Sequence, residues 1–283
     1  MGRVRREPLA AVRATPLLRC AGAPRDLGLD QGRAARDAIR ADARAHGFPA
    51  AATLFERVQA LRGADAPGAL ARDLARHFPH LAERAAGLAA GAGVAQAAFL
   101  DALARELEGE TSDGLHCEAG AASHALELRI AEPWPLTGFV VRRCAPDGGY
   151  ANLSFTRPAH VGSLAGVNEH GLAGVAVPIA APAPDERCVA PGILLLDQCI
   201  ERLDRVDKAL EWCEHRPGGG RARLFFCDAT GASAAIDIEG EKRHRRSATP
   251  AGGAGLVVRV DPRARVLVIE GAVIERFALD SEI

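Results

Sequence analysis

The spacing of apolar residues changes at Gly114, and this change constrains the fold more than any other feature of the chain. Before Gly114, apolar residues recur at intervals of three and four, which is typical of amphipathic helices. These helical patterns cover residues 27–47, 53–63, 67–78 and 94–109. After Gly114, short apolar runs with period two alternate with turn residues and predict strands. We therefore predict a helical N-terminal region over residues 1–114 that packs on a core over residues 115–283, in one compact unit.

The core is expected to contain two groups of strands separated by a pair of helices. The first strand-like runs lie at residues 125–130, 138–144, 150–155, 160–167 and 172–177. Helical patterns follow at residues 191–203 and 205–215. The second group of strand-like runs lies at residues 221–229, 232–240, 255–260 and 265–271. The order of helices, sheet, helices and sheet predicts a layered α+β fold with two antiparallel sheets between helical layers.

Composition excludes several classes of function. The formal net charge of -1 gives no electrostatic reason to expect a nucleic acid or an anionic membrane as partner. The N-terminus has no apolar run long enough for a signal peptide, and no apolar stretch reaches the ~18 residues of a membrane-spanning helix. We therefore expect a cytoplasmic protein. Its 7 cysteines form no CxxC pair, which favours reduced, mostly buried thiols.

Three segments of the core carry a resemblance to a known family. They are AGVNEHGLAGVAV (165–177), the helical stretch from Pro191, and LFFCDATGASAAIDIEG (224–240). In order and spacing they resemble the penicillin acyltransferase-like autoproteolytic hydrolases, which include the acyl-coenzyme A:6-aminopenicillanic acid acyltransferases. This family belongs to the N-terminal-nucleophile (Ntn) superfamily, together with the bile-salt hydrolases. Residues 22–39 are similar to the leading helix of the family.

The resemblance spans roughly residues 20–265 and implies an αββα four-layer sandwich with two antiparallel sheets and an N-terminal helical, propeptide-like region. It also implies that a precursor cuts itself before a cysteine, whose freed α-amino group then acts as the base. An amine with a pKa near 8 can take the proton of a neighbouring thiol. The implied activity is hydrolysis of an amide C–N bond or acyl transfer, on a small-molecule amide or acyl substrate and without a cofactor or metal.

The position of the nucleophile has two possible registers. The family places its cysteine directly after a glycine, and Asp113-Gly114 would then put Leu115 at the nucleophile position. Alignment on the cysteine selects Cys117, with cleavage between His116 and Cys117. The two registers differ by two residues, so the facing of side chains along a strand would be the same in both. Alternatively, Cys117 is a small buried residue, as free cysteines usually are.

Arg129 and Glu132 are the candidates to support this nucleophile. Arg129 matches the arginine of the family motif, and Glu132 can stand for its aspartate with one extra methylene. Ile130, however, replaces the asparagine of the motif. Arg129 and Glu132 could equally be an ordinary exposed ion pair, which contributes little stability.

The side chains that would stabilise an oxyanion are missing. Asn168 matches a turn residue of the family and is expected to be structural. The family asparagine expected after it falls at Val177 or Pro178, whose side chains cannot donate a hydrogen bond. A later Asn-His step is replaced by residues 257–262, VVRVDP. These departures support a second hypothesis, an uncleaved and catalytically inactive relative with a binding or structural role.

Two further sites are weaker candidates. His116, Cys117 and His124 could lie around a metal ion across a hairpin, but no fourth ligand with suitable spacing is present. The basic run at residues 241–247, EKRHRRS, could contact a phosphate group. Such a run is more often a solvated hairpin.

Overall fold

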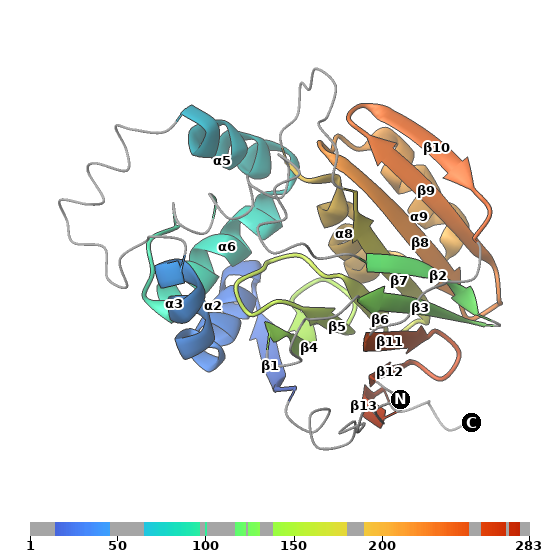
Figure 1. Cartoon of the computed structure of the whole chain (residues 1–283), viewed down its shortest axis with the longest axis horizontal. Coiled ribbons are helices and arrows are strands. Elements are labelled where there is room, and N and C mark those ends of the chain that lie inside the picture. Colours follow the sequence, from blue (N-terminus) through green and yellow to red (C-terminus); the bar gives the residue numbers. More distant parts are fainter. Residues whose placement is uncertain are drawn as a thin grey trace, which may run out of the picture.

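Two stacked β-sheets form the centre of the computed structural model, with helices on one side and at one end of the larger sheet (Figure 1). The structure describes residues 15–45, 65–96, 100, 117–122, 124–130, 138–179, 190–248, 256–269 and 272–277. The strand patterns of the core predict most of its strands to within a few residues, because alternating burial fixes which residues can face the other sheet.

The larger sheet has 8 strands in the order β1-β4-β5-β6-β7-β8-β9-β10. They are β1 (Leu17–Gly22), β4 (Val140–Pro146), β5 (Asn152–Thr156), β6 (Ala165–Asn168), β7 (Leu172–Pro178), β8 (Arg221–Asp228), β9 (Ser233–Glu239) and β10 (Lys242–Arg246). All neighbours are antiparallel except β1 and β4, which are parallel. The expectation of purely antiparallel sheets is wrong for this pair. A parallel pair needs a long crossover, and the N-terminal helices lie in the chain between β1 and β4.

The smaller sheet has 5 strands in the order β13-β12-β11-β3-β2. They are β2 (Cys117–Ala122), β3 (Ala125–Ile130), β11 (Leu256–Asp261), β12 (Val266–Ile269) and β13 (Ala272–Arg276). This sheet packs on strands β5 to β8 of the larger one. Leu126 and Leu128 of β3 are fully buried between the sheets, as is Val175 of β7 in the larger sheet.

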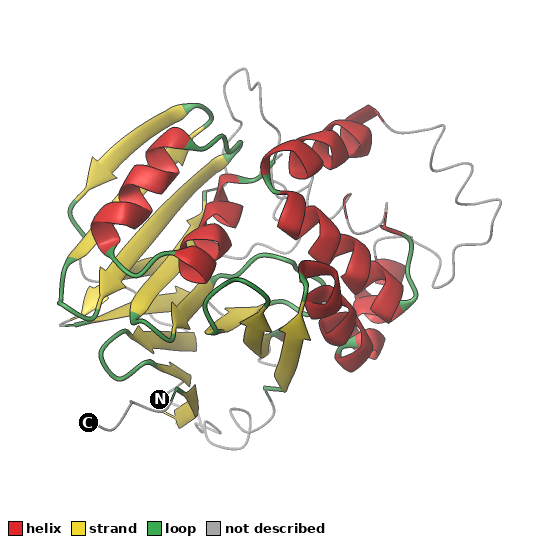
Figure 2. Cartoon of the chain, turned by 180° about the vertical axis from the view of Figure 1, so that it is seen from behind, coloured by secondary structure: helices red, strands yellow, loops and turns green. Residues whose placement is uncertain are grey.

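The helices divide into two groups along the chain. The N-terminal group contains α2 (Pro24–Ala34), α3 (Arg36–Ala45), α5 (Asp65–His77) and α6 (Pro79–Ala92). The second group contains the short 3-10 helix η2 (Gly192–Leu194), α8 (Leu195–Arg202) and α9 (Val206–His215), and α8 and α9 lie on the outer face of the larger sheet (Figure 2). The single helix expected over residues 27–47 is two helices, because the backbone leaves the helical conformation at Ala35. The helical patterns at 53–63 and, for the most part, 94–109 lie outside the described residues.

The expected α+β class with two sheets is confirmed. Within the described ranges, helices cover the outer face of the larger sheet and its β1–β4 end, and none covers the outer face of the smaller sheet (Figures 1 and 2). The predicted boundary at residue 114 lies outside these ranges. No helix in the described part of the chain is long and apolar enough to cross a membrane.

The N-terminal region also supplies a strand that the sequence reading missed. β1 begins ten residues before the first predicted helix and pairs in register with β4. Leu18 and Cys20 of β1 are buried, whereas Arg19 is exposed. The N-terminal region therefore extends the sheet of the core rather than only covering it.

Helices α2 and α6 touch backbone to backbone through glycines. The contact is made by Gly28 and Gly32 of α2 and by Gly87 and Gly91 of α6. A Cβ atom added at Gly28 would lie 2.0 Å from the carbonyl oxygen of Arg84, and one added at Gly87 would lie 2.0 Å from that of Arg25. No real Cβ atom can approach a carbonyl oxygen so closely, and only glycine is compatible with this crossing.

Gly91 lies in the last turn of α6, where an added Cβ would be 2.4 Å from the carbonyl oxygen of Leu29. Gly93 ends the helix, in the left-handed conformation with φ of 68°.

We predict that Gly87→Ala destabilises the protein by about 1–3 kcal/mol, because the added methyl group forces α2 and α6 apart. Urea unfolding followed by circular dichroism measures the change. Ala90→Leu is the control, since Ala90 is exposed on the same helix and should change stability by less than about 0.5 kcal/mol. Equal losses in the two variants would contradict the close contact.

Candidate functional site

Cys117 is the first residue of β2, at the outer edge of the smaller sheet. The antiparallel ladder pairs Cys117 with Ile130 and Glu118 with Arg129 of β3. The structure thus brings two predicted site residues, Cys117 and Arg129, onto neighbouring strands and onto consecutive rungs of one ladder. The alternative nucleophile position Leu115, with His116 and Glu132, lies outside the described residues.

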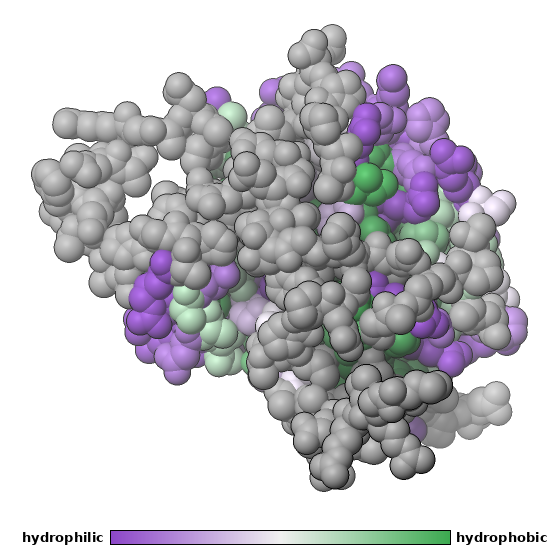
Figure 3. Space-filling view, viewed as in Figure 1, coloured by the Kyte–Doolittle hydropathy of each residue, from purple (hydrophilic) through white to green (hydrophobic). Residues whose placement is uncertain are grey.

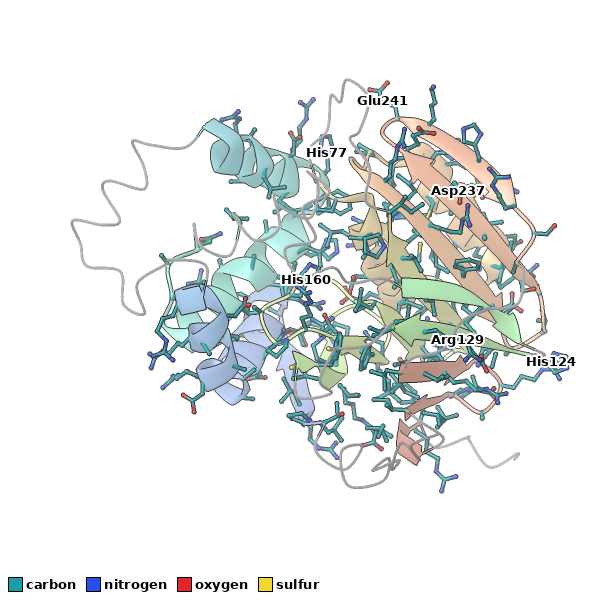
Figure 4. The ribbon with its side chains drawn as sticks, in the orientation of Figure 1. His77, His124, Arg129, His160, Asp237 and Glu241 are labelled. Carbon is teal, nitrogen blue, oxygen red and sulfur yellow. The ribbon has the colours of Figure 1, made fainter. Side chains whose placement is uncertain are left out.

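Arg129 is held by a carboxylate of its own strand. Its guanidinium donates a hydrogen bond to Glu127 over 2.9 Å, and both side chains are partly buried. Leu126, Leu128 and Ile130 alternate with these two residues and are buried between the sheets. The ion pair therefore lies on the outer face of the smaller sheet, where Figure 4 labels Arg129.

The two positions examined for an oxyanion donor lie at the end of β7. Val177 pairs with Arg223 and Pro178 with Ala222 in the ladder between β7 and β8. Neither Val177 nor Pro178 carries a polar side-chain atom, and Pro178 also lacks a backbone N–H group. At this strand end, stabilisation of an oxyanion would depend on backbone N–H groups alone.

Asn168 is structural, as expected. Its side-chain amide donates to the carbonyl oxygens of Ile200 and Leu203, at the end of α8, over 2.9 and 2.7 Å. Its side-chain oxygen accepts from the backbone N–H groups of His170 and Leu172 over 3.1 and 2.9 Å. Asn168 thus shapes the turn between β6 and β7 and closes the end of α8, and its hydrogen-bonding groups are fully engaged.

The sequence reading missed a buried set of charges, here called the central polar cluster. It consists of Gln31 of α2, Arg84 of α6, Arg142 of β4, Ser163, and Asp197 and Glu201 of α8. Arg142 is 1% exposed, and its guanidinium donates to Gln31 and to Ser163 over 2.9 and 2.8 Å. Asp197 accepts hydrogen bonds from the hydroxyl and the backbone N–H of Ser163, over 2.7 and 2.8 Å.

The two arginines of the central polar cluster face the two carboxylates. Arg84 forms an ion pair with Glu201, and Arg142 lies 3.6 Å from Asp197. Burial acts to raise the pKa of Glu201, but the neighbouring positive groups, above all Arg84, together outweigh it and hold the pKa below its usual range. Burial raises the pKa of Asp197, although Arg142 and Arg84 oppose the shift. The charges of the cluster balance, as buried charges must.

The central polar cluster joins the N-terminal helices to the core. Gln31 also donates to the carbonyl oxygens of Pro158 and His160, both over 2.9 Å. Gln31 and Arg84 come from the N-terminal region, whereas their partners come from β4, α8 and the loop between β5 and β6. We interpret the cluster as a structural clamp, because its charged groups are engaged with each other. The sequence did contain one sign of it, two carboxylates four residues apart in the apolar helix of residues 191–203.

Two remaining candidates have no site built around them. Within the described ranges, no three metal-ligating side chains gather into a metal site, and His124 is exposed in the turn between β2 and β3 (Figure 4). The basic run at 241–247 contains the edge strand β10, where the surface is mostly hydrophilic (Figure 3). Arg245 pairs with Glu214 and Arg246 with Asp237, which neutralises part of its charge.

Comparison with known proteins finds structural likeness only. No family model and no curated protein matches this chain. The penicillin V acylase from Agrobacterium tumefaciens matches with 16% identity and a TM-score of 0.33, covering 48% of this chain and 51% of that one. A variant of conjugated bile acid hydrolase from Clostridium perfringens matches with 17% identity and a TM-score of 0.26, covering 52% of this chain and 50% of that one. The chain thus spans about half the length of these two structures.

We predict that Arg142→Met lowers the free energy of unfolding by about 3–5 kcal/mol, because it leaves the buried charge of Asp197 undercompensated. Urea unfolding measures the loss. Arg223→Met is the matched control, since Arg223 also pairs with a carboxylate on the larger sheet, Asp237, but is 41% exposed. Its loss should not exceed about 1 kcal/mol. The double variant Arg142→Met/Asp197→Leu should recover part of the stability, and no recovery would contradict the charge argument.

Burial lowers the pKa of His80 to about 4, and Arg202 donates to its Nδ1 atom over 3.4 Å. A histidine with a pKa lowered by folding stabilises the protein above its unfolded pKa of about 6.5, and this stability is lost as the pH falls toward 4. We expect His80→Gln to reduce the acid sensitivity of the unfolding free energy by about 2–3 kcal/mol between these pH values. Urea titrations at pH 7 and pH 4.5 test this, with exposed His244→Gln as the control.

Proposed function

We propose that this chain is an amide hydrolase or acyltransferase of the Ntn type, with Cys117 as nucleophile after cleavage of the His116–Cys117 bond. The observation that carries the proposal is the place of Cys117 as the first residue of β2 in a two-sheet sandwich. Cleavage there would create a new chain terminus at the start of a strand that is already paired with β3. The α-amino group and the thiol of one residue would then lie together at a fixed position.

The chemistry follows from the two groups of this residue. The α-amino group accepts the thiol proton, and the thiolate attacks the carbonyl carbon of the amide. The tetrahedral intermediate collapses when the amine leaves with that proton, and an acyl-enzyme remains. Water then attacks the thioester in a hydrolase, whereas a second amine attacks it in an acyltransferase. No cofactor is needed for either outcome.

Arg129 is proposed to act as a positioning residue. It lies on the strand next to Cys117, one rung away in the ladder, on the outer face of the sheet, and Glu127 holds its guanidinium. A fixed positive charge near the new terminus favours the unprotonated form of the α-amino group. Glu132 is the proposed partner for the α-amino group, by its match to the family motif.

A second candidate function is an uncleaved, inactive relative that keeps the fold for binding or for a structural role. The observation in its favour is that Val177 and Pro178, at the described end of β7, have no side chain that could donate a hydrogen bond to an oxyanion. Asn168 uses its side chain within the fold, and neither Val177 nor Pro178 can replace it. The loss of one oxyanion donor alone typically slows such reactions about a hundredfold to a thousandfold.

Intact-mass spectrometry of the purified protein tests the proposal. We expect two chains, residues 1–116 and 117–283, because the reaction requires a free α-amino group on Cys117. Cys117→Ala should remain one chain and lose all hydrolysis of amide substrates. Cys227→Ala is the control, since Cys227 is a free, buried thiol of β8 and its loss should leave cleavage unchanged.

A single uncut wild-type chain would reject the proposal and support the inactive relative. A cut at Leu115 instead of Cys117 would also contradict it, since leucine has no nucleophilic side chain. Arg129→Leu separates the roles further. It should lower kcat and shift its pH profile toward higher pH, while Glu127→Gln removes a negative charge and should shift the profile toward lower pH.

A further inference from the structure

Four cysteines of the described residues form two buried pairs. Cys20 of β1 and Cys144 of β4 are direct partners in the parallel ladder, so their thiols lie on the same face of neighbouring strands. Cys199 of α8 and Cys213 of α9 have their Sγ atoms 3.7 Å apart. All four are free thiols that are at most 2% exposed. Side chains of direct partners in neighbouring strands share one face of the sheet, which places the first pair within reach of a disulfide.

The surroundings of the two pairs differ. Cys144 lies two residues from Arg142 on β4, so both side chains point to the same face of the sheet, toward α6 and α8. The hydrogen bond from Cys20 and the guanidinium groups of Arg142 and Arg84 together lower the pKa of Cys144 to about 7. Burial and the charge of Glu201 oppose this shift.

At the second pair, the guanidinium of Arg243 donates to the backbone carbonyl oxygen of Cys213 over 3.0 Å. Burial raises the pKa of Cys199, and Cys213 and Asp197 raise it further. A thiol reacts with oxidants as its thiolate, so the two pairs should differ in reactivity although both are buried. The Cys199–Cys213 pair therefore serves as an internal control for the reactivity of the Cys20–Cys144 pair.

We propose that Cys20 and Cys144 form a peroxide-responsive modification site that closes to a disulfide between β1 and β4. The thiolate of Cys144 attacks one oxygen of a hydroperoxide, which gives a sulfenic acid and releases hydroxide or an alkoxide. The thiol of Cys20 then attacks this sulfur, a disulfide forms, and water leaves. Two thiols lose two electrons in total, and the peroxide gains them. β1 is the edge strand of its sheet, so its local opening admits a small oxidant without unfolding of the core.

This disulfide has a consequence for the whole chain. Cys20 lies before the proposed cleavage site and Cys144 after it, so oxidation would tie the two parts of a cleaved protein together covalently. The inference does not depend on cleavage, because β1 pairs with β4 in the one chain described. It therefore stands or falls separately from the proposed function.

The test treats the full wild-type protein with hydrogen peroxide, blocks the remaining thiols with N-ethylmaleimide, and maps tryptic peptides without reduction. We expect a linked pair of peptides, residues 20–25 with residues 144–187, that is lost on reduction. It should form at least about ten times faster than a link between the peptides of Cys199 and Cys213, in proportion to their thiolate fractions. Cys144→Ser and Cys20→Ser should abolish the link, and Cys199→Ser should leave it unchanged.

The rate should also depend on pH. The thiolate fraction of a group with a pKa near 7 rises from about a tenth at pH 6 to about nine-tenths at pH 8, so the rate should increase about tenfold. The wild-type experiment needs no variant to fold and decides the matter alone. Absence of the linked peptides, or a faster link between Cys199 and Cys213, would overturn the proposal, as would a rate that does not change with pH.

Discussion

The balance of two buried arginines against two buried carboxylates is the constraint on which the rest of the structure depends. Arg84 and Arg142 lie in the interior with Asp197 and Glu201, and each charge would be costly without the others. The four groups come from α6, β4 and α8, so the charge balance exists only when the N-terminal helices are seated on the core. The glycine contact between α2 and α6 makes this seating possible, because Gly28 lies against the backbone of Arg84 itself. The close packing against α2 and the buried ion pairs therefore both involve the same helix, α6.

In this arrangement, the propeptide-like N-terminal region is an integral part of the fold. Such a region could be a removable cover, but here it supplies β1, the edge strand of the larger sheet, and two members of the central polar cluster. If the chain is cut before Cys117, both parts remain joined by a parallel strand pair and by buried ion pairs. Their separation would expose charges that have no other partner within the described fold, and it would remove a strand from the sheet.

The candidate catalytic site contrasts with this well-connected interior. Cys117 begins an edge strand, and Arg129 forms an ion pair with Glu127 of its own strand. The side chain of Asn168, the one asparagine of the family-like turn, is hydrogen-bonded to the end of α8 and to the backbone of the turn before β7. The parts of the resemblance that the described residues explain are therefore those that build the sandwich. The catalytic part rests on one cysteine at the start of a strand, and for this reason the cleavage state of the chain separates the two candidate functions.

The sequence alone determined the α+β class, most strand positions of the core but not β2, β10 and β13, the helices α5, α8 and α9, and the structural role of Asn168. These follow from local rules, namely the period of apolar residues and the turn chemistry of asparagine and glycine. Only the tertiary structure decided that β1 pairs in parallel with β4, that Gly91 lies against the backbone of Leu29, and which thiols are neighbours. It also decided which charged residues are buried together. The physical reason is that these features depend on contacts between segments far apart in the chain, such as Gln31 with Arg142, and no local pattern encodes a partner 111 residues away.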